Sequence, residues 1–133
     1  MADTGVVSGK PETRSVKIVT DLSDKEYYLC NLDLTNDDEV DGLAADATKN
    51  AYILLETYDG STNNRTGVIA TGGQSKVKLG GTVTVNDFIV PDGNGKGIAA
   101  TADNQIYAAV PLQNGVSGDI IAVQVTRGTF IIA

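Results

Sequence analysis

The chain of 133 residues is long enough for one domain with a modest core, because a chain of this size buries roughly two-thirds of its unfolded surface. Its 10 basic and 17 acidic side chains give a formal charge of −7, which repels phosphate backbones and anionic lipids, so we expect no nucleic acid and no membrane as partner. Histidine is absent and cysteine occurs once, which removes the usual general base near neutral pH and any intrachain disulfide. The sequence therefore predicts a protein that is not an enzyme and that uses no cofactor.

The N-terminus carries neither the basic nor the apolar segment of a signal peptide, and no apolar run approaches the roughly 18 residues of a membrane span. These features predict a soluble protein made in a cytoplasm. Cys30 lies in the run Tyr27–Leu32 without a histidine to activate it. We therefore expect a buried structural thiol rather than a nucleophile.

Residues 1–15 are polar, and only Val6 and Val7 among them could be buried. A segment that contains Gly5, Gly9 and Pro11 and so few apolar groups cannot offset the entropy lost on ordering by itself. The sequence predicts either a flexible tail or an arm that becomes ordered against a partner through Val6, Val7 and Pro11. Residues 16–133 are expected to form a single β domain.

Most of the remaining chain consists of short stretches with alternating apolar residues, separated by turn residues. This pattern predicts roughly nine strands and an all-β antiparallel barrel or sandwich. The stretches are 16–20, 27–34, 51–58, 68–70, 77–85, 105–112, 119–126 and 129–133. Gly72 and Gly73 are expected to end the strand at 68–70, and Gly42–Ala47 could form one or two helical turns.

The stretch from Val77 to Ala99 is expected to be a β-meander at the centre of the fold, with Val77, Leu79, Val83 and Val85 on the core face. Aspartate, asparagine and glycine residues at its turns supply the local hydrogen bonds and positive φ angles that turns require. The predicted turn residues, including those of a later turn, are Asp87, Asp92, Gly93, Asn94, Gly95, Gly118 and Asp119.

Two acidic patterns have an alternative interpretation as metal sites. Asp92–Gly97 together with Asp103 overlaps the spacing of a calcium loop, but Lys96 occupies a ligand position, so a hairpin turn is favoured. The acidic residues of Asn36–Asp41 could hold a divalent cation loosely, yet a solvated loop is the more common role of such a run.

Ala51–Tyr58 is the most continuously apolar stretch of the chain. It is expected to be a strand that is covered on both faces, or on its second face by another subunit. In the second case an oligomer interface would be formed by Ala51, Tyr52, Ile53 and Leu54.

The second half of the chain resembles the small all-β decoration, or cement, proteins of tailed-bacteriophage capsids. The resemblance covers Gly67–Thr126 and lies in the order and spacing of four segments: Gly67-Val68, Val83–Asp87, Asp92–Gly97 and Gly118–Val123. It implies a β-tulip-like fold, a homotrimer, a place on the outer surface of the virion's capsid and a role in stabilising the major capsid protein against the pressure of packaged DNA.

A receptor- or glycan-binding β-domain on a virion surface remains the alternative. An exposed cluster formed by the tyrosines would favour it, because aromatic rings provide both an apolar face and a polar group for binding. The tyrosines concerned are Tyr27, Tyr52, Tyr58 and Tyr107.

Overall fold

The computed structural model describes residues 11–18, 22, 24–32, 39–58 and 65–132. These residues form nine strands and no helix, which confirms the expected all-β class. In the described part of the chain there is accordingly no helix that could cross a membrane. The strands are β1 (Pro11–Ile18), β2 (Leu29–Leu32), β3 (Glu39–Leu43), β4 (Tyr52–Tyr58), β5 (Arg65–Lys78), β6 (Ile89–Pro91), β7 (Gly97–Ala99), β8 (Gln105–Pro111) and β9 (Ile120–Phe130).

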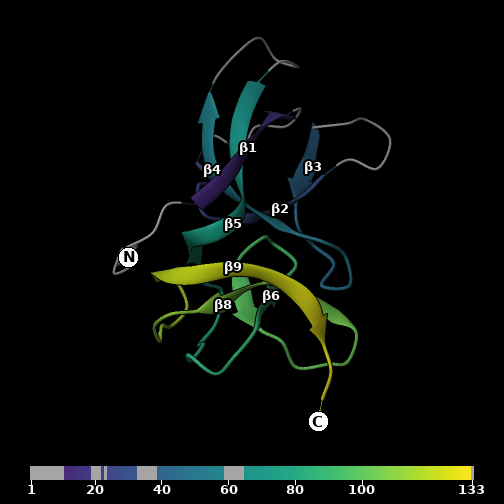
Figure 1. Cartoon of the computed structure of the whole chain (residues 1–133), viewed down its shortest axis with the longest axis vertical. Coiled ribbons are helices and arrows are strands. Elements are labelled where there is room, and N and C mark those ends of the chain that lie inside the picture. The colour runs from purple at the N-terminus through teal and green to yellow at the C-terminus, as the bar shows by residue number, and fades with distance from the viewer. Residues whose placement is uncertain (1–10, 19–21, 23, 33–38, 59–64, 133) are drawn as a thin grey trace.

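The strands pair in the order β1-β3-β2-β4-β5-β9-β8-β6-β7, and β1 also pairs with β5. The first five strands therefore form a closed circuit of pairs, which makes up the upper group in Figure 1. A second group, β5-β9-β8-β6-β7, lies below it. The β1–β3 pair is parallel and the other strand pairs are antiparallel, so the sheet is mixed rather than purely antiparallel as expected.

Strand β5 connects the two groups. Its residues 65–73 pair with β1, and its residues 74–78 pair with β9. The prediction that Gly72 and Gly73 end a strand was wrong, because the strand continues through both. Gly73 has φ +73, a conformation that glycine adopts without steric cost, and it lies where β5 passes from one group to the other.

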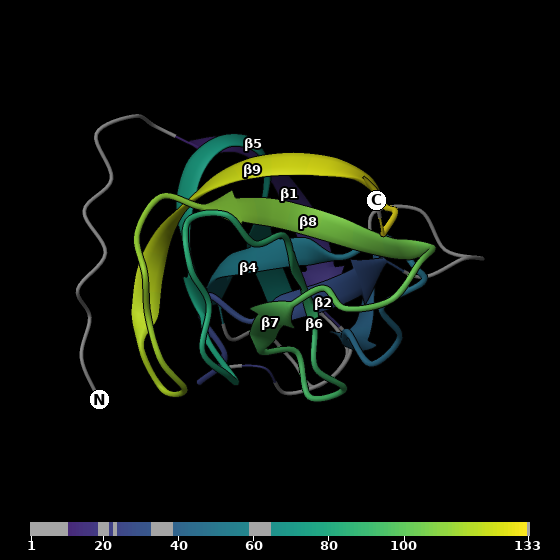
Figure 2. The same ribbon diagram turned by 90° about the horizontal axis from the view of Figure 1, so that it is seen from below.

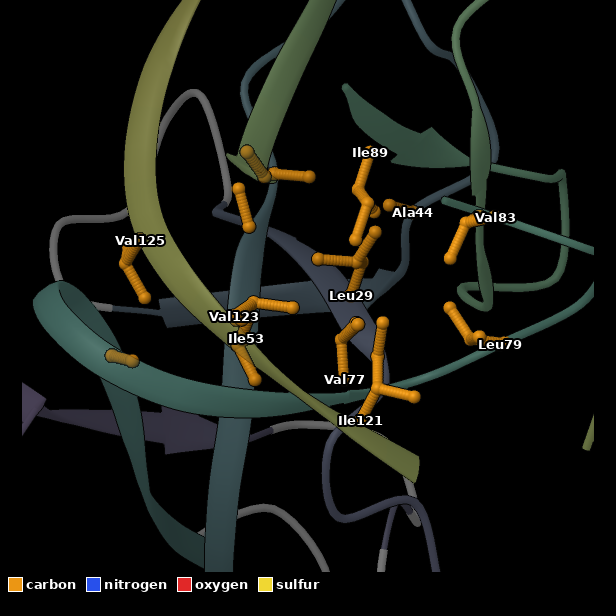
Figure 3. Packing of buried hydrophobic residues seen from close by; sticks show 14 residues of the cluster. Leu29, Ala44, Ile53, Val77, Leu79, Val83, Ile89, Ile121, Val123 and Val125 are labelled. Carbon is orange, nitrogen blue, oxygen red and sulfur yellow. The ribbon is translucent and has the colours of Figure 1, made fainter. Parts of the chain in front are cut away.

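The described residues form two hydrophobic clusters, and successive side chains of one strand enter different clusters, as the alternation of a β-strand requires. In β4, Ile53 enters the larger cluster and Leu54 the smaller. The larger cluster lies between the two groups of strands (Figure 3) and consists of Leu29, Ala44, Ala51, Ile53, Ala70, Val77, Leu79, Val83, Ile89, Ala108, Ala109, Ile121, Val123 and Val125. The smaller cluster belongs to the first five strands and the turn after β1, and consists of Val16, Ile18, Leu22, Cys30, Val40, Leu54 and Ile69.

The segment after the acidic run differs from its prediction. Gly42 and Leu43 belong to strand β3 rather than to a helical turn. β3 pairs with both β1 and β2, and these pairings satisfy its backbone hydrogen bonds better than an isolated helical turn could. Tertiary pairing thus outweighs the weak local preference.

The stretch from Val77 to Ala99 is not a meander. Its first strand, β5, pairs with the distant β9, and only the β6–β7 hairpin joins neighbours in sequence. Leu79 and Val83 form isolated bridges to Gly97 and Gly115 instead of belonging to a continuous strand.

The N-terminal prediction is corrected in part. Residues 11–15 belong to β1 and pair with β5, beginning with Pro11 opposite Gly73, so they are not part of a flexible arm. Val6 and Val7 lie outside the described residues.

Candidate functional site

Two loops lie side by side at one end of the second group of strands (Figure 2), and they carry three exposed apolar side chains. The first loop leads from β5 to β6, and the second connects β8 to β9. The exposed residues are Val85, Leu112 and Val116, with exposed fractions of 51%, 46% and 55%. We call these three residues the apolar loop surface.

Hydrogen bonds between the loops hold this surface in place. Val83 and Gly115 exchange two backbone hydrogen bonds, of 3.0 and 3.1 Å. The backbone N–H of Val85 donates to the side-chain oxygen of Asn114 at 3.0 Å. Since Leu112 and Val116 each lie two residues from Asn114, the three apolar side chains belong to one small region.

Each loop also contains a turn closed by an aspartate. The carboxylate of Asp87 accepts from the backbone N–H of Thr84 at 2.7 Å, and the carboxylate of Asp119 accepts from that of Val116 at 3.0 Å. Both aspartates are among the turn residues that the sequence predicts. Each aspartate binds a backbone N–H three residues before it, so the backbone that carries Val85 and Val116 is held in place. A surface that is already ordered loses less entropy on binding.

The prediction that Val85 lies on the core face of a strand was wrong, because its side chain is exposed. Leu112, expected as the last residue of the strand at 105–112, lies just after β8 ends at Pro111. Val85 follows the bridge at Val83 and lies in a turn, where strand alternation no longer applies. In β8 the register shifts between Tyr107 and Ala109, which disrupts the alternation that leads to Leu112. The exposure of Val116 was not predicted. Its neighbours Gly115, Ser117 and Gly118 are typical of a turn, and an apolar residue among them indicates an exposed position.

The residues proposed from sequence for an oligomer interface lie elsewhere. Ala51, Ile53 and Leu54 are at most 1% exposed within the single chain, so their side chains cannot contact a second subunit. Ile53 and Leu54, on opposite faces of β4, are both covered by the chain itself, which agrees with the first of the two expectations for this part of the strand. Tyr52 is half-buried, and its ring lies 4.1 Å from the guanidinium carbon of Arg127.

The tyrosines do not form one cluster in the described part of the chain. Tyr27 lies beside Lys76, Tyr52 beside Arg127, and Tyr107 beside Phe88, whose ring centre is 4.6 Å away. The side chain of Tyr58 is outside the described residues.

Asp92 and Asp103, the two outermost carboxylates of the calcium-like pattern, have separate roles. Asp92 accepts from the backbone N–H groups of Asn94 and Lys96, at 2.8 and 3.1 Å, within the hairpin turn that also contains the positive-φ residues Gly93 and Gly95. Asp103 accepts from the backbone N–H of Ile132. Among the described residues no group of three or more cysteine or acidic side chains comes together. Asp37 and Asp38 are not described.

Cys30 is fully buried in the smaller cluster, as predicted for a structural thiol. Its sulfur lies 3.3 Å from the backbone oxygen of Tyr52. Burial raises the pKa of the thiol from 9.0 to about 12, because the apolar surroundings disfavour the thiolate. The group is therefore a neutral thiol at physiological pH.

The chain matches no protein-family profile and no curated protein sequence.

Proposed function

We propose that this protein is a capsid decoration, or cement, protein that binds the outer surface of an icosahedral phage head and stabilises it against the pressure of packaged DNA. Two features support this role: the resemblance of Gly67–Thr126 to such proteins, and the apolar loop surface. The apolar loop surface is the observation that carries the proposal, because apolar side chains gathered on ordered, exposed loops are typical of protein–protein contacts.

The fold suits a module that must resist strain. We infer that the closed circuit β1-β3-β2-β4-β5 forms a small barrel of the β-tulip kind, because closure leaves no free edge among these strands. The shared strand β5 then ties the barrel to the strands that carry the apolar loop surface. A rigid module transmits a clamping force without first deforming.

A homotrimer would strengthen attachment, because three linked copies bind a symmetric shell more tightly than one. The subunit contact must use side chains other than Ala51, Ile53 and Leu54, which are buried. Ile131 and Ile132, which follow β9, are 60% and 57% exposed and are the residues we propose for this contact. Val6 and Val7 are proposed to contact the major capsid protein as an arm, without Pro11, which pairs with Gly73 in β5.

The test is co-sedimentation with expanded capsids from which the protein has been stripped. The double variant Val85→Ser/Val116→Ser removes most of the apolar loop surface at exposed positions, where stability changes by about 0.5 kcal/mol or less. Thr82→Ser, exposed in the same loop, is the matched control. We expect wild type and the control to sediment with capsids to saturation, and the double variant to remain in the supernatant. Equal binding by all three proteins would show that the apolar loop surface is not the contact.

A further inference from the structure

Asn114 is followed directly by Gly115, and the chain contains the same pair a second time as Asn94 and Gly95. An asparagine before a glycine is open to spontaneous deamidation, because glycine has no Cβ to hinder the approach of its backbone nitrogen to the side-chain amide. Both asparagines are exposed. The surroundings of the two pairs differ, and these differences decide which asparagine reacts in the folded protein.

The reaction needs only water and a base from solvent. The backbone nitrogen of the glycine gives its proton to the base and attacks Cγ of the asparagine, and the bond from Cγ to the side-chain nitrogen breaks with release of ammonia. Water then opens the cyclic succinimide at one of its two carbonyl groups, which yields aspartate or isoaspartate. An amide is thus replaced by a carboxylate without oxidation or reduction. The reaction requires an electrophilic Cγ and a glycine nitrogen that solvent can reach.

The side-chain amide of Asn114 is activated for this attack. Its oxygen Oδ1 accepts from the backbone N–H of Val85 at 3.0 Å. A donor fixed at this oxygen draws electron density from Cγ and stabilises the negative charge that develops on the oxygen, as the donors of an oxyanion hole do. Val85 lies in the turn that the Asp87 carboxylate closes, so the donor is in place before the reaction begins.

The two glycine nitrogens differ in how well the fold protects them. Gly95 is buried, and its N–H donates to the oxygen of Ala44, beside the first group of strands, at 3.0 Å. Gly115 is half-buried, and its N–H donates at 3.1 Å to Val83 in an isolated bridge between two loops. Opening this bridge frees the nitrogen of Gly115 without separating the two groups of strands. Such local openings cost less free energy than those that expose a core.

We propose that Asn114 is a site of spontaneous deamidation, whereas the fold protects Asn94. The new carboxylate lies between Leu112 and Val116 in sequence and therefore adds a negative charge to the apolar loop surface. An aspartate still offers an oxygen to the N–H of Val85, so the loops stay together. The charge must be desolvated when this surface binds a partner, which weakens binding. This consequence rests on the proposed function, but the modification itself does not.

The experiment incubates the folded full-length protein at mildly alkaline pH and follows deamidation by mass spectrometry of tryptic peptides. Asn94 and Asn114 fall in different peptides, 79–96 and 97–127, so each site is the control for the other. Fragmentation of each peptide locates the modified residue. We expect Asn114 to convert about tenfold faster than Asn94 in the folded protein. In urea the two should convert at nearly equal rates, because the hydrogen bonds of the fold are absent.

Equal rates at the two sites in the folded protein, or a faster rate at Asn94, would overturn the proposal. Conversion of Asn114 in urea but not in the folded protein would also overturn it, because the bridge to Val83 would then protect the site completely.

The variant Asn114→Asp tests the effect on binding separately. It should keep the Tm of wild type and bind stripped capsids about tenfold more weakly. Asn94→Asp, also at an exposed position, changes the net charge by the same amount and should bind as wild type does. Equal capsid binding by all three proteins would contradict the effect on the apolar loop surface. If wild type itself does not bind capsids, the proposed function fails, and the deamidation rates still decide the modification.

Discussion

Ile53 and Leu54 are adjacent in β4, yet their side chains lie in different hydrophobic clusters. Both are at most 1% exposed, so β4 joins the two clusters through its backbone. We expect Ile53→Ala and Leu54→Ala each to lower the free energy of unfolding by about 2–5 kcal/mol, the usual cost of truncating a buried aliphatic side chain. Each variant should unfold in a single transition, because each substitution affects a strand that the two clusters share.

Guanidinium unfolding followed by tyrosine fluorescence and by circular dichroism checks this. Leu112→Ala, at an exposed position, is the control and should change stability little. Two separate transitions in the Leu54→Ala variant would show that the clusters unfold independently.

These two residues also show what the sequence could predict. The apolar run at 51–55, within the expected strand at 51–58, predicted a strand covered on both faces, because each face of a buried strand needs apolar side chains. In the strand predicted at 119–126, Ile121, Val123 and Val125 alternate along the sequence, and all three are buried. Local pattern is sufficient where one strand lies against a continuous core.

Local pattern failed where distant segments decide the structure. Gly72 and Gly73 are typical of a strand end, but pairing with β1 and then β9 carries β5 through them. The pairing of β5 with β9 and the burial of Lys78 depend on segments far apart in sequence, and no local spacing records them. The apolar loop surface was missed for the same reason, because the bridge between Val83 and Gly115 ends the alternation.

Gly95 makes the contact between the β6–β7 hairpin and the first group of strands. Its backbone oxygen accepts from the N–H of Leu29 at 2.6 Å, and its N–H donates to Ala44 at 3.0 Å. It has φ +80, and a Cβ there would lie 2.8 Å from the Leu29 oxygen. We expect Gly95→Ala to be clearly more destabilising than Gly93→Ala. Gly93 has φ +103, but nothing lies within 4 Å of the position that an added Cβ would take.

Thermal unfolding of the two variants measures the difference. Gly93→Ala should cost about 1–2 kcal/mol from backbone conformation alone. Equal Tm values for both variants would contradict the assigned contact between Gly95 and Leu29.

Cys30 should make stability decrease with pH in the alkaline range. Its pKa is raised from 9.0 to about 12 in the folded protein, so the thiol contributes stability that is fully present below pH 9.0 and is lost as pH rises toward 12. Cys30→Val keeps an apolar side chain of similar size and removes the titration. Guanidinium titration between pH 8 and pH 11 measures the free energy of unfolding. This free energy should fall more steeply with pH for wild type than for Cys30→Val. Parallel curves for the two proteins would show that the thiol is not shielded from solvent.

Truncation separates the N-terminal residues that support the fold from those proposed as an arm. Removal of residues 1–10 leaves every described strand pair intact, so Tm should not change. Removal of residues 1–15 also deletes most of β1 and its pairing with β5, so Tm should fall markedly. The shorter deletion should nevertheless weaken co-sedimentation with capsids, and unchanged attachment would contradict the assignment of Val6 and Val7 as a contact.

The most direct test of the proposed role is the temperature at which DNA-filled heads release their DNA, measured with a dye that fluoresces on free DNA. Heads lacking the protein are compared before and after saturation with wild type or with Val85→Ser/Val116→Ser. A cement protein that binds through the apolar loop surface should raise the release temperature, and the double variant should not. An identical release temperature with and without bound wild-type protein would contradict the account.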